Sequence, residues 1–536
     1  MFKEWKLTIT VALITAFAFI LRIYNLTIIP VFADEAIYIR WSQIMRNVPE
    51  LRFLPLSDGK QPLFMWATIP LFKLFSDPLF AGRFLSVLCG LGTMIGVGVL
   101  TFLLFQNTKS QITNNKQTLN TNDKNSKIEK FDIVWKLEFG DWNLTLPLFS
   151  MFLYSISPFA IFFDRLALAD SMLSMFGIWT FIFSLLAIRF LRLDMAMIAG
   201  FMLGGAFLTK SPALYFALLL PTTVLFLDLA KKARTIRIFK TIGLWCVTWG
   251  IGYGFYNILR LGTNFQMLKS RSLDYVYPVS HIFQTPFDPL KPFLMEVGRW
   301  LWIMGPSVFI LLVILGIIFN WKKFPSQIIF LIILAFAPIF ASAEFAKVFT
   351  ARYIFFSIPY LIILASSIVI TNIPKLAKQL LIGIFIVHSS VIVYLFLFTP
   401  QSAPLPRSER SGYLEEWTAG YGIKEIATQL KNEQFDNPNE KIVVGTEGYF
   451  GTLPDGLQMY LNDTPSITVI GVGEPIRDVH NSLIESKKAG NKTYLVVNDS
   501  RFLGDAEKLG LQLLQKYPKA LKPDGTRENL LLFEVR

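Results

Sequence analysis

Long apolar stretches dominate the first 400 residues of this 536-residue chain. They recur at close to the roughly 20 residues that an α-helix needs to cross a bilayer. The pattern therefore predicts an α-helical, polytopic membrane protein. Eleven membrane-spanning helices are predicted, at about 7–26, 82–105, 143–162, 170–190, 195–209, 212–228, 241–259, 298–320, 326–343, 353–370 and 380–398, of which the stretch at 195–209 is the shortest for a span.

Lysine and arginine concentrate in every second connection between these stretches, within 109–136, 189–192, 231–240, 321–323 and 375–378. Basic loops mark the cytoplasmic side of a membrane protein. The pattern therefore predicts a multi-pass plasma-membrane protein with a cytoplasmic N-terminus. An odd number of spans then places the loop at 27–81 and everything after residue 400 on the outer face.

Three connections are too long to be simple turns. The outer loop 27–81 is rich in Phe, Leu and Trp, which predicts short amphipathic helices lying on the membrane surface. The outer loop 260–297 is similar. The cytoplasmic loop 106–142 is rich in Asn, Lys, Thr and Ser and predicts disorder.

From about residue 400 the composition becomes that of a soluble domain. Strand-like runs at 441–446, 466–472 and 492–499 alternate with helical patterns at 478–490 and 503–517. This order predicts a small extracytoplasmic α/β domain over 400–536, after a membrane domain over 1–399. Gly-rich turns and aromatics at 417–430 and 445–461 could contact a glycan, but structural turns are the simpler interpretation.

Composition narrows the function classes. The net charge of +13 is carried by the cytoplasmic connections, so it serves topology and does not call for a nucleic-acid partner. Two cysteines, both inside predicted spans, exclude a disulfide framework. Three histidines far apart in sequence do not form a zinc site.

Charged residues that gather near the outer ends of the predicted spans are the candidates for chemistry, because charge is costly at membrane depth. The alternative interpretation for each charged residue is structural: its side chain extends so that only the charged group reaches the membrane surface. An energetic group donor outside the cell must arrive on a lipid, since nucleotides are scarce there. Sugar transfer from a lipid phosphate needs a carboxylate base and cations around the departing phosphate. The candidates are Asp34, Glu35, Lys60, Arg83, Asp164, Arg165, Asp170, Lys210, Glu344, Lys347 and Arg352.

Six motifs make the chain resemble the GT-C superfamily of membrane glycosyltransferases. Closest is the group with the protein mannosyltransferases and the lipid A aminoarabinose transferases (the PMT-like, family 39 group). The resemblance covers roughly residues 7–370. Its carriers are ADEAIY at 33–38, GKQPLFMW at 59–66, GRFLSVLCG at 82–90, FFDRLALADSMLSMF at 162–176, LTKSPAL at 208–214 and ARYIFFSIPYL at 351–361.

The resemblance implies a role for each matched position. Asp34 would be the catalytic carboxylate, Glu35 would bind the acceptor or hold the loop, and Lys60 would contact the donor phosphate. Arg165 would pair with phosphate or with an acid of the first outer loop. The remaining substrate-binding candidates are Arg83, Asp170, Lys210 and Arg352. Two positions depart from the family pattern. Gln61 replaces the first proline of a Lys-Pro-Pro segment, and Asp164 stands at a commonly uncharged position.

The implied activity is transfer of a sugar from a polyprenyl-phosphate donor to an outer-face acceptor, with inversion at the anomeric carbon. The acceptor could be a protein, a lipid or a glycan. A divalent cation near Asp34 and Glu35 is possible on this resemblance, and no other cofactor is expected. The alternatives are a ligase that uses a pyrophosphate-linked glycan and a transporter or flippase of lipid-linked sugars. The absence of internal repeats in the sequence argues against the transporter.

Overall fold

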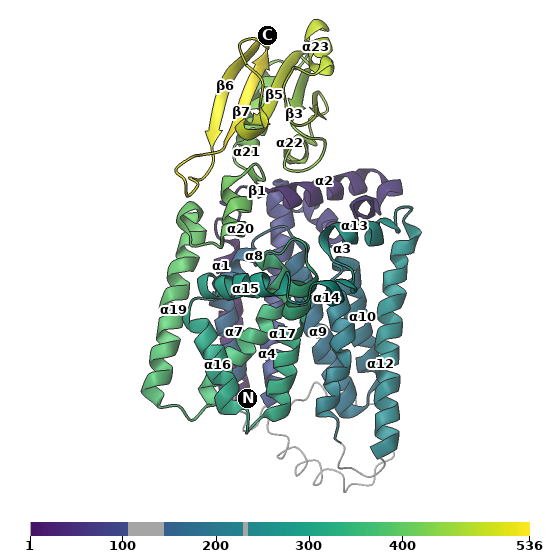
Figure 1. Cartoon of the computed structure of the whole chain (residues 1–536), viewed down its shortest axis with the longest axis vertical. Coiled ribbons are helices and arrows are strands. Elements are labelled where there is room, and N and C mark those ends of the chain that lie inside the picture. The colour runs from purple at the N-terminus through teal and green to yellow at the C-terminus, as the bar shows by residue number, and fades with distance from the viewer. Residues whose placement is uncertain (1, 106–143, 229–233) are drawn as a thin grey trace.

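A bundle of long helices and a smaller mixed domain are stacked along the long axis of the protein (Figure 1). The computed structural model describes residues 2–105, 144–228 and 234–536, so the predicted disordered loop at 106–142 lies outside the described residues. The N-terminus lies at the far end of the bundle, and the C-terminus lies in the mixed domain at the opposite end (Figure 1).

Six helical segments within the described ranges are long and apolar enough to cross a membrane. Two bent pairs of helices also meet this test, with bends of 60° and 104°. The chain is therefore a multi-pass membrane protein. The six are α1 (Phe2–Ile23), α4 (Pro78–Phe105), α9 (Ala169–Phe190), α17 (Pro325–Phe345), the segment Ala351–Ile370 and α19 (Lys375–Phe398); the pairs are α7 (Thr145–Ile156) with α8 (Pro158–Asp164), and α15 (Leu290–Ile303) with α16 (Val308–Asn320).

All eleven predicted stretches are helical, but they are not eleven equivalent spans. The stretch at 298–320 is wrong as one straight helix, because the chain turns after Ile303 at a break that contains Gly305 and Pro306. The helix α10 (Leu193–Thr209) has 17 residues and reaches only about 26 Å. It stands beside the long helix α12 (Arg234–Asn257), and α11 (Ala213–Leu219) continues into the 3-10 helix η4 (Leu220–Phe226). The segment Ala351–Ile370 comprises η6 (Ala351–Ser357), α18 (Ile358–Ser366) and η7 (Ser367–Ile370).

Residues 27–81, the predicted first outer loop, fold into short helices, as their aromatic composition predicted. The amphipathic helix α2 (Ala33–Asn47) lies across the end of the bundle, roughly perpendicular to the long helices (Figure 1). The second outer loop likewise contains the short helices α13 (Met267–Tyr275) and α14 (His281–Gln284). The other elements of the first loop are η1 (Pro49–Leu51), η2 (Leu54–Asp58), α3 (Leu63–Thr68) and η3 (Ile69–Lys73).

The C-terminal part contains a five-stranded sheet in the order β4-β3-β5-β7-β6. The three predicted strands are confirmed as β3 (Ile442–Thr446), β4 (Ile467–Gly471) and β5 (Lys492–Asn498), and they run parallel. The strands β6 (Leu511–Pro518) and β7 (Asn529–Val535) complete the sheet in antiparallel pairing. Its helices are α20 (Arg407–Arg410), α21 (Ile423–Asp436), α22 (Asp455–Leu461) and α23 (Asn481–Lys488), with the short helices η8 (Pro400–Ser402), η9 (Ser411–Glu415) and η10 (Asp499–Arg501).

The helix predicted at 503–517 is wrong. Gly510 has a φ of +66°, in the left-handed region, which ends the preceding turns immediately before β6. Leu511 then pairs with Val535 of β7, so the sheet takes up the backbone hydrogen bonds that a helix would have formed within itself. Leu511, Leu513 and Leu514 therefore belong to an edge strand.

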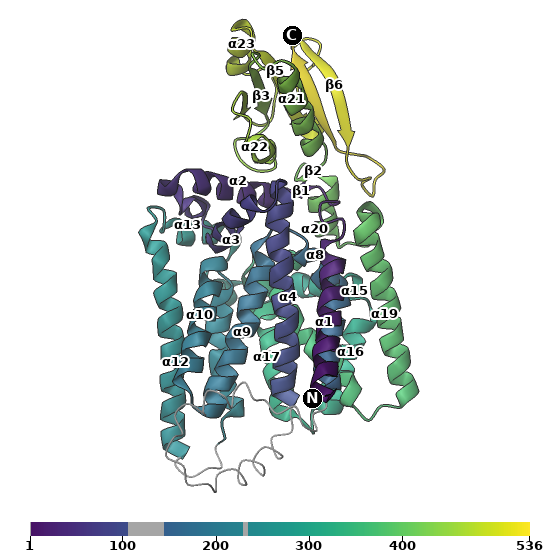
Figure 2. The same cartoon turned by 180° about the vertical axis from the view of Figure 1, so that it is seen from behind.

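The C-terminal chain is joined to the first outer loop by main-chain pairing. The strand β1 (Val31–Phe32) pairs antiparallel with β2 (Ala419–Gly420). The helix α22 lies on α2 when the molecule is seen from behind (Figure 2), where Gln43 donates to the carbonyl of Met459 at 2.8 Å. These contacts place the mixed domain directly over the outer loop that carries the predicted catalytic acid.

Candidate functional site

Asp34 lies in the first turn of α2 and holds two cations. Its Oδ1 is 3.3 Å from Lys60 Nζ, and its Oδ2 accepts a hydrogen bond of 2.6 Å from Arg352 Nη1. Lys60 follows η2 in the same outer loop, whereas Arg352 belongs to η6, at the start of a membrane segment. The fold therefore brings together three of the charged side chains that the sequence predicted for the site.

Electrostatics keep this carboxylate ionised. Burial alone would raise the pKa of Asp34, but the charges of Lys60 and Arg352 outweigh it and hold that pKa well below its usual range. Burial would likewise lower the pKa of Lys60, and Asp34 with its neighbours raises it above the ordinary value instead. Asp34 and Lys60 are therefore both charged at neutral pH.

Aromatic rings line the two cations. Lys60 Nζ lies 5.2 Å from the ring centroid of Tyr38 and 5.8 Å from that of Trp41, and the Arg352 guanidinium lies 5.7 Å from that of Phe32. Such contacts stabilise a cation without neutralising it. The side chains of Asp34, Lys60 and Arg352 remain 19%, 23% and 17% exposed, so a ligand can reach all three.

A second ion pair borders the first. Lys210 Nζ is 2.6 Å from Asp170 Oδ1 and 5.0 Å from the ring of Tyr353, and Arg352 lies 5.3 Å from the same ring. Gln61, next to Lys60, donates to Ser211, next to Lys210, at 2.8 Å. Lys60, Lys210 and Arg352 thus converge on one area from three segments that are distant in sequence.

Glu35 and Arg83 form a separate pair that is fully buried. Arg83 Nε and Nη2 bond both oxygens of Glu35, at 2.8 and 2.7 Å, and the guanidinium also donates to the carbonyls of Leu26, Ile29 and Pro30. Glu35 in turn accepts from the backbone N–H groups of Phe32 and Ala167. Neither side chain has exposed surface, so this geometry supports the loop-holding role considered for Glu35 and gives Arg83 the same role instead of substrate binding.

Arg165 is also buried, and it ends a helix. It donates four hydrogen bonds to carbonyls in and just after the last turn of α1, on Leu21, Arg22, Tyr24 and Asn25. These carbonyls have no partner within the helix, and a cation there also suits the helix dipole. The predicted pairing of Arg165 with phosphate or with a loop acid is therefore corrected to a structural one.

Asp164 belongs to the same structural layer. Its Oδ2 accepts a hydrogen bond of 2.9 Å from Arg22, and neither side chain is exposed. Arg22 was not among the predicted site residues, because an arginine near the end of a span is normally a topology signal. Asp164 itself could have indicated Arg22. A carboxylate buried among membrane helices needs a positively charged partner, and the sequence shows this acid at a position that is commonly uncharged.

The donor set near Asp34 does not fit a divalent cation. No group of three His, Cys, Asp or Glu side chains in the described part of the chain could hold a metal ion. The oxygens of Asp34 face Lys60 and Arg352, and those of Glu35 are taken up by Arg83 and two N–H groups. A divalent metal ion could bind these carboxylates only by displacing Lys60, Arg352 or Arg83. The proposed reaction therefore uses side chains alone.

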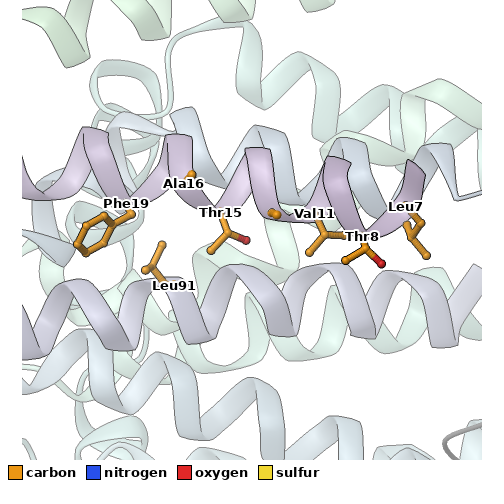
Figure 3. Close-up of a pocket in the computed structure, with 8 residues that line it drawn as sticks. Leu7, Thr8, Val11, Thr15, Ala16, Phe19 and Leu91 are labelled. Atoms are coloured by element: carbon orange, nitrogen blue, oxygen red, sulfur yellow. The ribbon is translucent and has the colours of Figure 1, made fainter. Parts of the chain in front are cut away.

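A groove of about 770 Å³ runs along α1 and α4 away from this site (Figure 3). Its lining carries no charged residue and includes Leu7, Val11, Thr15, Phe19 and Leu91. All of these lie on long apolar helices, and α1 is largely exposed along its length. The groove is therefore part of the surface that faces lipid, and it carries no chemistry.

Comparison with known proteins rests on structure. No family model matches the chain, and no curated protein matches it in sequence. The crystal structure of ArnT from Cupriavidus metallidurans in the apo state is similar to this chain with a TM-score of 0.53 at 14% identity, covering 100% of this chain and 99% of that one. ArnT bound to undecaprenyl phosphate gives a TM-score of 0.53 at 15% identity, covering 99% and 98%.

The chain has a GT-C fold. At these identities the similarity to ArnT concerns the fold alone, and it extends over the membrane bundle and the C-terminal domain together. The resemblance carried by the six motifs is thereby confirmed as to fold.

Proposed function

We propose that the protein is a glycosyltransferase that moves a sugar from a polyprenyl-phosphate donor to an acceptor on the outer face of the membrane. The observation that carries this proposal is one ionised carboxylate, Asp34, held by Lys60 and Arg352 beside the ends of the membrane helices, with Lys210 near Arg352 at the ring of Tyr353. Three cations suit a phosphate, and a carboxylate suits an acceptor hydroxyl. ArnT, which has the same fold, binds undecaprenyl phosphate, and this supports the donor class.

The two cations on Asp34 explain how the site can be inactive until the donor binds. A donor phosphate competes with Asp34 for Lys60 and Arg352, because both anions need the same donors. As the cations move to the phosphate, Asp34 loses the charges that depress its pKa and becomes a better base.

Transfer then follows in one displacement. Asp34 accepts the proton of the acceptor hydroxyl, and that oxygen attacks the anomeric carbon. The bond from this carbon to the phosphate oxygen breaks on the opposite face, which inverts the centre. Lys60 and Arg352 stabilise the charge that develops on the departing polyprenyl phosphate. Lys210 supplies a further cation for the phosphate, and Asp170 positions it.

The proposed orientation places the N-terminus in the cytoplasm and the site on the outer face of the plasma membrane. It is supported by the basic connections, which by the positive-inside rule face the cytoplasm. The N-terminus and the C-terminal domain lie at opposite ends of the bundle, which agrees with this orientation (Figure 2). Such a site would receive its donor from the outer leaflet.

A donor screen tests the proposal. The purified protein in nanodiscs is offered radiolabelled polyprenyl-phosphate and polyprenyl-pyrophosphate sugars, with crude envelope acceptors of protein, lipid and glycan type. Release of polyprenyl phosphate by the wild type, and not by Asp34→Asn, is the expected result. Release of polyprenyl pyrophosphate, from the pyrophosphate donors alone, would instead indicate the glycan ligase. Movement of the intact lipid-linked sugar between vesicle leaflets would indicate the flippase.

A further inference from the structure

The carboxyl ends of the three parallel strands lie together on the side of the C-terminal domain that faces α2. The central strand β3 continues to β4 on one side, whereas β5 leads on to the antiparallel pair on the other side. Open α/β sheets bind ligands outside the carboxyl ends of strands at such a change of direction. The residues that follow β3, β4 and β5 therefore form a candidate binding surface outside the site described above.

Exposed aromatic side chains mark this surface. Tyr449 is 74% exposed and Phe450 46% exposed, in the loop directly after β3. Gly448 and Gly451 flank them with φ values of +68° and +122°, a geometry that presents both rings at the tip of the loop. The partly exposed ring of Trp417 borders Gly451, so aromatic side chains from two segments of the C-terminal domain accompany this loop.

Polar groups accompany the rings. Arg501 stacks on Trp417, with its guanidinium 3.6 Å from the ring centroid, and pairs with Glu474, which is 41% exposed. Two buried polar atoms at this end of the sheet, Asn498 Oδ1 and Thr452 Oγ1, have no hydrogen-bond partner among the described residues. Buried polar atoms without a partner are uncommon and point to an additional ligand or water.

Buried side chains connect this surface to the candidate catalytic acid along α2, since Tyr38 and Trp41 are only 8% and 5% exposed. Asp34, Tyr38 and Trp41 are spaced at i, i+4 and i+7, so they share one face of the helix over roughly 10 Å. Trp41 stacks on Phe450 of the C-terminal domain, with ring centroids 5.6 Å apart. Contacts between side chains thus lead from the exposed loop after β3 to the side chain of Asp34.

We infer that Trp417, Tyr449, Phe450, Glu474 and Arg501, here named the acceptor platform, bind the oligosaccharide part of the acceptor. The C–H faces of sugar rings pack against aromatic rings, and their hydroxyls pair with carboxylate, guanidinium and amide groups. Arg501 pairs with Glu474 and also lies 3.8 Å from Glu447, so its charge is already balanced by carboxylates, which disfavours an anionic ligand. The inference deepens the proposed function, on which its link to Asp34 rests.

Direct binding tests the platform without relying on turnover. The full-length protein in nanodiscs is titrated by calorimetry with soluble hexasaccharides of glucose, mannose, galactose and N-acetylglucosamine. At least one is expected to bind saturably, and Tyr449→Ala and Trp417→Ala are each expected to weaken that binding by about tenfold or more, as for a truncated aromatic anchor. The matched control is Phe435→Ala, which removes a ring that is 83% exposed on α21 and should leave binding unchanged.

The outcomes separate this inference from the proposed function. Absence of saturable binding to any of the four hexasaccharides overturns the inference, as does binding that Tyr449→Ala and Trp417→Ala leave intact. Release of polyprenyl phosphate is measured on the same preparations. Release without hexasaccharide binding rejects the platform alone, whereas platform-dependent binding without release from any donor rejects the proposed function alone.

Discussion

Replacing Asp34 by asparagine should weaken turnover and strengthen donor binding at the same time. In the free protein Lys60 and Arg352 are both held by the Asp34 carboxylate. The amide side chain of asparagine has the same shape but carries no charge and cannot accept a proton from the acceptor. The substitution therefore removes the base and, in the same step, removes the carboxylate that competes with the donor phosphate for Lys60 and Arg352, while Lys60 keeps its pair with Asp58.

The structure sets the size of both effects. Loss of a positioned base typically costs about 10²- to 10⁴-fold in rate. The three side chains are 17% to 23% exposed, so solvent screens each ion pair and limits it to roughly 1 kcal/mol. Freeing both cations should then tighten the binding of polyprenyl phosphate by roughly 1 to 2 kcal/mol, or about 5- to 30-fold.

The assay measures both quantities on one preparation. Single-turnover release of polyprenyl phosphate gives the rate, and titration with polyprenyl phosphate gives the dissociation constant. The matched control is Asp58→Asn, because Asp58 also lies 3.3 Å from Lys60 but pairs with Arg271 instead of Arg352. A normal rate for Asp34→Asn, or weaker phosphate binding than in the wild type, would refute the competition between carboxylate and phosphate.

Three further substitutions probe the supporting structure. Glu35→Gln breaks the buried pair with Arg83, which should cost about 3–5 kcal/mol and appear as a lower thermal midpoint and yield, not as a change in donor KM alone. Glu409→Ala removes the acceptor for the backbone N–H that precedes Arg352, so the donor KM should rise several-fold while Glu409→Gln, which keeps an acceptor, restores it. Burial raises the pKa of Asp455 to about 6, so its ionisation destabilises the fold as the pH rises from about 4 through 6. Asp455→Asn should therefore raise the thermal midpoint at pH ~7.5 relative to the wild type and have little effect near pH ~4, and equal shifts at both pH values would contradict this placement.

Residue type and position along the spans were sufficient to predict much of the site. Asp34 and Lys60 stood in the aromatic-rich loop between the first two apolar stretches, and Lys210 and Arg352 stood at predicted outer ends of apolar stretches, where charge has few reasons to occur. The same signal could not separate them from Arg83, because the sequence does not say which charged side chain faces a cavity and which faces another helix. That distinction depends on packing between segments that are far apart in the chain.

The fold shows the same limit. Apolar length predicted the helical stretches but not the 104° bend between α15 and α16, although Gly305 and Pro306 lie at its break. Leucine-rich residues 511–518 fit a helical pattern, and only pairing with β7 makes them a strand. Local composition therefore predicted the class of each membrane segment more securely than the elements of the C-terminal sheet, where tertiary pairing decides.

Residues after the last membrane helix contact the backbone next to both Asp34 and Arg352. These contacts give a structural reason for the membrane bundle and the C-terminal domain to occur in one chain. The strand β2 pairs with β1 immediately before Asp34, and Glu409 accepts a 2.7 Å hydrogen bond from the N–H of Ala351 immediately before Arg352. Both partners of the central ion pair are therefore positioned by residues that follow the last membrane helix. Since the acceptor platform lies on the same C-terminal chain, an acceptor bound there would contact the elements that set the separation of Asp34 and Arg352. If the proposed sites are correct, acceptor binding at the platform would be coupled to the separation of Asp34 and Arg352 through short, direct contacts, without a change in the membrane bundle.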